Sequence, residues 1–194
     1  MSMTSYHFSK GFTLIETMIA VTILSLAIVG PLFTASRAIV AAQSSRDQLV
    51  ASYLAQEGIE YVRAMRDNEY LAAYQSGGAS VSSVAWNNFL NNPVQDISAI
   101  TQCRMPKVCT LDPVQGAVSP MASCPNDVCT PLYLLTNGVY SQQNLSGSKA
   151  TSFIRTIQAT DVSATEESIV SQVSWSFHGV PYSVTITDHL TPWQ

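Results

Sequence analysis

Hydrophobic and polar positions divide this chain into segments with different patterns. The first is an apolar run of 22 positions, Phe12 to Phe33, in which Glu16 is the only charged residue. A helix of about 20 apolar residues spans the hydrocarbon core of a bilayer. The run therefore predicts a membrane-spanning helix. Glu16 stands out in it, because a carboxylate inside such a helix costs ~2.5 to 3.5 kcal/mol.

After Pro31 the pattern becomes amphipathic. Apolar residues recur at spacings of three to four residues or their sum, which is the periodicity of a helix with one buried face. They are Val50, Leu54, Tyr61, Met65 and Ala72. On the solvated face, Arg63 lies at pairing distance from both Glu60 and Asp67. The spacing predicts one helix over residues 12–75.

Two glycine-containing sites interrupt or end this helix. Gly30–Pro31 is expected to bend or locally melt it, because proline removes one backbone hydrogen bond and clashes with the preceding turn. Residues 76–80 contain Gly77 and Gly78 and are expected to end it.

Residues 81–148 show no long periodic segment. They hold six of the nine prolines and all four cysteines. An unstructured loop of this length is unusual in a compact domain. We expect a functional excursion or a set of short elements, with residues 132–135 as one candidate strand.

The carboxy-terminal part has the pattern of β-strands. Residues 152–159, 168–177 and 180–189 are rich in Val, Ile, Thr and aromatics, and Val173, Trp175 and Phe177 alternate with polar residues. His178–Gly179 is a candidate hairpin turn. Three antiparallel strands laid over the amphipathic part of the helix predict an α+β fold.

Composition and motifs argue against an enzyme or a nucleic-acid-binding protein. Charged residues make up 11% of the chain and its net charge is −4, so there is no basic footprint. The sequence has no phosphate loop, no His-Glu-x-x-His and no Gly-x-Ser-x-Gly. The histidines are expected in the leader, a turn and a strand end, and the acids in a solvated loop; they are His7, His178, His189, Asp161, Glu166 and Glu167. We expect no catalytic residue, no metal site and no cofactor.

The amino terminus resembles type IV pilins and type II secretion pseudopilins. The resemblance lies in residues 10–16, Lys-Gly-Phe-Thr-Leu-Ile-Glu, in the apolar run and in the Gly30-Pro31 pair. It implies that a prepilin peptidase recognises Lys10-Gly11-Phe12, cuts after Gly11 and N-methylates Phe12. Glu16 would then lie one helical turn from the new amine and pair with the amine of a neighbouring subunit during polymerisation.

The helix from residue 55 to residue 67 more closely resembles that of minor pilins and minor pseudopilins. The resemblance implies a leader at 1–11, the helix at 12–75 and an exported head at 76–194. Expected partners are the prepilin peptidase, other subunits, an inner-membrane assembly platform and the bilayer. The expected location is the cytoplasmic membrane, single-pass, and then a cell-surface or periplasmic filament. The alternatives are an unprocessed signal anchor and a membrane-tethered binding module that does not polymerise.

An exported head places its cysteines in an oxidising compartment, where disulfides are common. Cys103, Cys109, Cys124 and Cys129 are separated by five, fourteen and four residues. These spacings lack the Cys-x2-Cys pairs usual in zinc ribbons. Two disulfides are favoured over free thiols and over a metal site, and three connectivities remain open.

Overall fold

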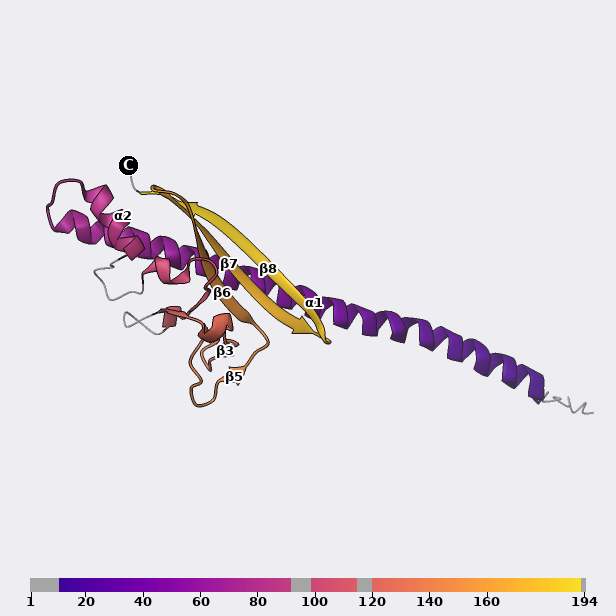
Figure 1. The fold of residues 1–194 in the computed structure, drawn as a ribbon. Coiled ribbons are helices and arrows are strands. Elements are labelled where there is room, and N and C mark those ends of the chain that lie inside the picture. Colours follow the sequence, from indigo (N-terminus) through magenta and orange to yellow (C-terminus); the bar gives the residue numbers. More distant parts are fainter. Residues whose placement is uncertain (1–10, 92–98, 115–119, 193–194) are drawn as a thin grey trace, which may run out of the picture. The chain divides into compact units, whose positions relative to one another are not determined.

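The computed structural model describes residues 11–91, 99–114 and 120–192, and the chain divides into two compact units at Arg46 and Asp47. The first unit consists of the amino-terminal part of helix α1. The second contains the rest of α1 and the head. Figure 1 shows the elements with their labels.

Helix α1 runs from Leu14 to Gln75. It remains helical through Gly30 and Pro31, so the local melting expected there does not occur. Proline removes only one N–H donor from a helix of 62 residues. The Thr34 hydroxyl, which donates to the Pro31 carbonyl at 2.9 Å, adds a contact across this turn. The helix ends as expected at the glycines, where Gly77 has φ +69°.

From Ala51 to Ala73, one face of α1 forms part of the head's core. Its buried residues are Ala51, Leu54, Ala55, Gly58, Ile59, Val62, Met65, Glu69 and Ala73. At Gly58 the helix approaches the sheet closely, since a methyl group there would overlap Ser171 and lie 2.9 Å from Ile157 Cδ1.

The main sheet has five strands in the order β2-β1-β6-β7-β8. The long strands are β6 (Ile154–Ser163), β7 (Glu166–Phe177) and β8 (Val180–Leu190), and they pair antiparallel as the alternation predicted. The predicted turn joins β7 to β8, with positive φ at His178 and Gly179. Two short strands, β1 (Cys109–Leu111) and β2 (Met121–Ser123), extend the sheet beyond β6.

The region expected to be irregular contains several short elements. They are helix α2 (Val81–Asn91), the 3-10 turns η1 (Ile100–Cys103) and η3 (Pro125–Asp127), and a small sheet of β3 (Tyr133–Leu134), β4 (Tyr140–Ser141) and β5 (Lys149–Ala150) in the order β4-β3-β5. Helix α2 buries Ala85, Trp86 and Phe89 in the core. The α+β class predicted from the sequence is confirmed.

Candidate functional site

The start of α1 places the residues that the sequence singles out. Gly11 and Phe12 precede the helix, and Phe12 is 81% exposed. The Thr13 carbonyl accepts hydrogen bonds from the N–H groups of Glu16 and Thr17 at 3.1 and 3.2 Å. Lys10 and His7 lie outside the described residues. The described part of the motif is therefore a short exposed segment followed at once by a helix.

Thr13 and Glu16 also fit a local pattern that the sequence analysis missed. A threonine followed three residues later by a glutamate is the capping-box spacing. In the structure the Glu16 N–H lies 3.4 Å from the Thr13 hydroxyl oxygen, which gives one half of that arrangement. An acid in the first turn also interacts favourably with the helix dipole. The Thr13 hydroxyl thus caps the start of the helix through the Glu16 N–H, and the Glu16 carboxylate lies in the first turn, where the helix dipole favours it.

The other polar side chains near Glu16 are satisfied within the helix itself. The hydroxyls of Thr17, Thr22 and Ser25 donate to the carbonyls of Leu14, Ile19 and Val21 at 2.8 Å each. Such bonds let hydroxyl-bearing residues lie in a lipid environment without unpaired donors. Glu16 is therefore the one charged residue of the apolar run, and the hydroxyls of Thr17, Thr22 and Ser25 bond to the helix backbone.

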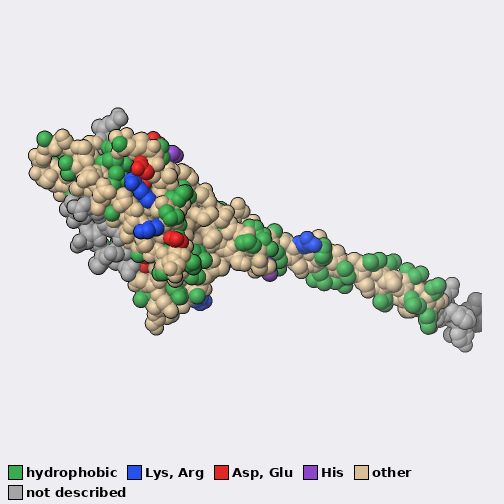
Figure 2. Space-filling model, viewed as in Figure 1, with side chains coloured by type: hydrophobic (Ala, Val, Ile, Leu, Met, Phe, Trp, Pro, Cys, Tyr) green, Lys and Arg blue, Asp and Glu red, His purple; other side chains and the backbone are tan. Residues whose placement is uncertain are grey.

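The apolar side chains of this segment are exposed, as Figure 2 shows along the amino-terminal helix. By length and composition, α1 is able to cross a membrane, and no residue in its most apolar 18-residue stretch is buried. The Arg37 guanidinium lies 4.9 Å from the centre of the Phe33 ring, where the apolar run ends. A cation stacked on an aromatic ring at this boundary suits the membrane–water interface.

Residues 7–30 match the model of the prokaryotic N-terminal methylation motif. This motif is typical of type IV pilins and pseudopilins, which are structural subunits and not enzymes, and it implies processing by a prepilin peptidase. Together with the long apolar helix, the motif makes the amino-terminal part of the chain pilin-like and suggests inner-membrane anchoring and export. Comparison with curated proteins and with solved structures found no match.

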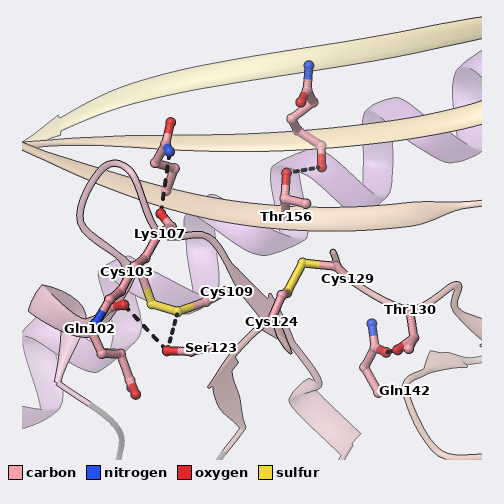
Figure 3. The surroundings of a disulfide bond; sticks show 12 residues. Gln102, Cys103, Lys107, Cys109, Ser123, Cys124, Cys129, Thr130, Gln142 and Thr156 are labelled. Atoms are coloured by element: carbon pink, nitrogen blue, oxygen red, sulfur yellow. Dashed lines mark hydrogen bonds between the residues drawn. A yellow bond between two sulfur atoms is a disulfide. The ribbon is translucent and has the colours of Figure 1, made fainter. Parts of the chain in front are cut away.

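All four cysteines form disulfides in the structure, and each pairs with its neighbour in sequence (Figure 3). Cys103 pairs with Cys109 and Cys124 with Cys129, at sequence separations of 6 and 5 residues. Both bridges are buried, and Ser123 Oγ lies 3.9 Å from Cys109 Sγ. Each bridge closes one short loop, so neither joins distant parts of residues 81–148.

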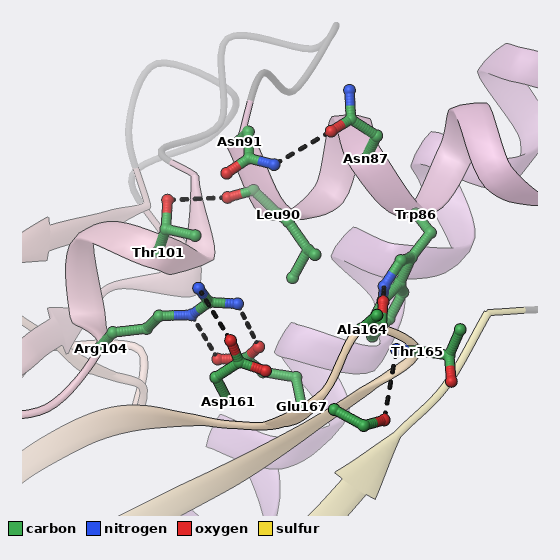
Figure 4. A network of polar contacts seen from close by, with 11 residues as sticks. Trp86, Asn87, Leu90, Asn91, Thr101, Arg104, Asp161, Ala164, Thr165 and Glu167 are labelled. Carbon is green, nitrogen blue, oxygen red and sulfur yellow. Dashed lines mark hydrogen bonds and ion pairs between the residues drawn. The ribbon is translucent and has the colours of Figure 1, made fainter.

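Of the acids expected in a solvated loop, Asp161 is exposed near the end of β6, whereas Glu167 is buried. Glu167 lies in β7, is 1% exposed and accepts two hydrogen bonds from the Arg104 guanidinium, at 2.9 and 2.6 Å. Asp161 lies 3.7 Å from the same guanidinium (Figure 4). The hydrogen bond to Glu167 raises the pKa of Arg104 above its usual range. The expectation of a role in solubility is therefore wrong for Glu167, which joins β7 to the segment after η1.

A second arginine ties α1 to the outer strand of the sheet. Arg63 donates to Asp188 at 2.8 Å and to Glu60 at 2.6 Å. The hydrogen bond to Asp188 raises the pKa of Arg63, and the same bond lowers the pKa of Asp188. Asp67 pairs with Arg66 at 2.8 Å, so the predicted Arg63–Asp67 pair is not formed.

A third arginine is completely buried beneath α1. Arg155 donates to the carboxylate of Glu57, to the Leu54 carbonyl and, at 2.7 Å, to the Leu111 carbonyl. A buried cation requires such partners, because removing one leaves an uncompensated charge. The ion pairs of Arg63 and Arg155 join α1 to β8 and β6, so they are structural contacts.

The described part of the head offers no constellation suited to catalysis. Among these residues, no group of three or more His, Cys, Asp and Glu is arranged to hold a metal ion. His189 pairs with Glu166 at 2.7 Å, and His178 packs edge-on against Phe177 in the hairpin turn. The cavity beside Trp86, about 680 Å³, is lined by Ser, Thr, Ala and Pro besides the indole, none of which titrates. The amino-terminal motif remains the candidate functional site.

Proposed function

We propose that this chain is a minor pilin or pseudopilin, a structural subunit that polymerises through its amino-terminal helix. In this proposal a prepilin peptidase cuts after Gly11 and methylates Phe12, and the apolar helix moves from the bilayer into a filament. The inner-membrane assembly platform and other subunits are its partners. The filament is a type IV pilus or a type II secretion pseudopilus.

The observation that supports this proposal best is the isolation of Glu16. It is the only charge between Phe12 and Phe33, and the hydroxyls near it bond to the helix backbone. Once the leader is removed, the new amine of a neighbouring subunit is a suitable partner, because pairing offsets two charges that are costly in apolar surroundings. Glu16 would thereby set the register between subunits.

The helix-capping role of Glu16 is the competing explanation, and two substitutions separate the roles. Glu16→Gln removes the charge but keeps a side chain that suits the third position of a capping box. Glu16→Val removes both. If charge pairing drives assembly, both variants are inserted and cleaved normally, and both are depleted from filaments sheared from cells that also express the parent chain.

The measurement is the ratio of variant to parent in the sheared filaments, divided by their ratio in the membrane. Incorporation of Glu16→Gln at the parental level, with Glu16→Val depleted, would assign Glu16 to capping and refute charge pairing. Absence of the parent chain from sheared filaments would refute polymerisation and favour the tethered binding module.

A further inference from the structure

Strand β8 is a long edge of the main sheet. It spans Val180–Leu190 and pairs with β7 on one side, and among the described residues no strand pairs with its other side. Figure 1 shows it as the outermost strand. Every residue from Val180 to Leu190 has a partner in β7, without a register shift. The opposite edge of β8 is correspondingly regular.

The turn determines which backbone groups point outward. A two-residue turn makes the flanking pair, Phe177 and Val180, a hydrogen-bonded pair, and bonded and non-bonded pairs then alternate along the ladder. The even-numbered residues of β8 therefore bond to β7, and the odd-numbered residues direct their N–H and C=O groups away from it. The His189 N–H bonds to the Asp188 carboxylate. The remaining outward donors belong to Ser183, Thr185 and Thr187. They lie about 6.8 Å apart, the spacing that an extended backbone matches.

This edge lacks most of the devices that keep sheet edges from pairing. Proteins protect long edges with lysines, inward-pointing charges, bulges or prolines. Strand β8 has no Lys or Arg, and its one carboxylate, Asp188, is engaged by Arg63. Pro181 occupies an outward position at the start of the strand, which leaves the stretch after it open. Within residues 11–91, 99–114 and 120–192, no strand covers this stretch of the edge.

The side chains beside this edge indicate what such a chain would carry. Tyr182, Val184 and Ile186 share the face of β8 that faces the core, yet Tyr182 is 42% exposed and the other two are only half-buried. The Tyr182 ring stacks on Trp175 at 5.7 Å. One more strand with apolar residues at alternate positions would cover this strip and satisfy the free backbone groups together.

We propose that β8 is a docking edge for an extended, uncharged strand of another protein, which pairs antiparallel and places apolar side chains beside Tyr182, Val184 and Ile186. Antiparallel pairing is chosen because it is slightly more stable per residue than parallel pairing.

A second copy of β8 does not fit this role. Phe177, at the start of the hairpin, packs in the same cluster as Ala51, whereas Asp188 meets Arg63, so β8 and this part of α1 run in the same direction. Antiparallel pairing of two β8 strands would reverse α1 in one copy. Subunits of one filament keep the same direction along it, so this step rests on the proposed function.

The test uses the full chain in detergent micelles and a fluorescent peptide with the sequence of residues 168–177, the natural antiparallel partner of β8. Thr185→Pro removes an outward N–H while leaving the β7 ladder intact. Thr185→Ala is the matched control, because both variants lose the hydroxyl that accepts from Gln172. We expect the parent and Thr185→Ala to bind equally by fluorescence anisotropy and Thr185→Pro to bind about tenfold more weakly.

A second measurement does not depend on how Thr185→Pro folds. The same peptide, N-methylated at its central residues, keeps its side chains but lacks N–H donors and should not bind. Hydrogen exchange at Thr185 and Thr187 should slow when the unmodified peptide is added. Failure of the parent to bind, equal binding of the methylated peptide, or self-association of the parent through β8 would each overturn the proposal. Filament assays of the Glu16 variants test the proposed function separately, since Glu16 lies outside the head.

Discussion

The contact between α1 and the sheet at Gly58 leads to a stability prediction with an unusual sign. Replacing glycine by alanine in a helix interior normally stabilises the helix by ~0.8–1.0 kcal/mol. At Gly58 the added methyl would overlap Ser171 Oγ and lie 2.9 Å from Ile157 Cδ1. Both neighbours are fully buried. Overpacking costs about 1–3 kcal/mol, and the overlap with Ser171 Oγ favours the upper half of that range, so after subtracting the helix gain we expect Gly58→Ala to lose roughly 1–2 kcal/mol net.

Ser171→Ala provides the compensating change. Ser171 Oγ is buried and has no hydrogen-bond partner among the described residues, so its removal alone should be neutral or stabilise by up to about 1 kcal/mol. In the double variant the overlap with Oγ is gone, and the new methyl keeps its contacts with Ile157 Cδ1 at 2.9 Å and with the Cβ of residue 171 at 3.3 Å. The double-mutant cycle should therefore show a coupling energy of at least about 1 kcal/mol.

Unfolding of the full chain in detergent, followed by the fluorescence of the buried Trp86 and Trp175, measures these changes. Each kcal/mol should shift Tm by about 2–4 °C for a head of this size. Gly78→Ala is the control, because its methyl would meet only Ser76 Oγ at 4.0 Å. A Gly58→Ala variant as stable as the parent, or effects that add without coupling, would refute the close-packing argument.

Three further predictions concern processing, the disulfides and pH. Gly11→Val should leave full-length precursor in the membrane, and mass spectrometry that finds Phe12 methylated in this variant would contradict the assigned cleavage site. Reduction should lower the stability of the head by about 2 kcal/mol per bridge, as expected for such short loops. It should also increase proteolysis near Cys124–Cys129 before β6–β8 are cleaved. Four free thiols in protein alkylated in its native compartment would disprove the bridges. The lowered pKa of Asp188 contributes stability that is present above the unfolded-state pKa of about 3.9 and is lost as pH falls through the lower folded-state pKa. The Tm difference between the parent and Asp188→Asn should therefore shrink in acid. A Tm difference that does not change with pH would contradict the Arg63 pairing.

The strands of the carboxy-terminal part were predictable because their signals are local. Alternation at Val173, Trp175 and Phe177 identifies the inward face of β7, and His178–Gly179 provides the backbone conformation of a tight turn. The same parity could have identified Glu167 as inward-facing, since it lies six positions before Val173, an even offset. Its partner could not be inferred, because Arg104 lies 63 residues away in sequence.

Helix α2 was missed because its stability is not local. Its sequence is rich in Ser, Asn and Val, which are weak helix formers, and the helix depends on burial of Ala85, Trp86 and Phe89. At the amino terminus, by contrast, the helix cap was predictable from local sequence. The spacing of Thr13 and Glu16 is that of a capping box, but Glu16 was interpreted only as an assembly residue because it is an acid in an apolar run. Disulfide connectivity required the fold, since spacing left three pairings open.

The shortness of the covalent loops has a mechanical consequence. When a chain is pulled from its ends, a cross-link withholds only the segment that it encloses. The two bridges enclose sequence separations of 6 and 5 residues, and each withholds roughly 12–15 Å of extension. Nearly the whole contour of the head is therefore free to lengthen under tension. Resistance to pulling must come from shearing the long strands β6, β7 and β8 and from separating them from α1, because the two bridges withhold only a small part of the contour.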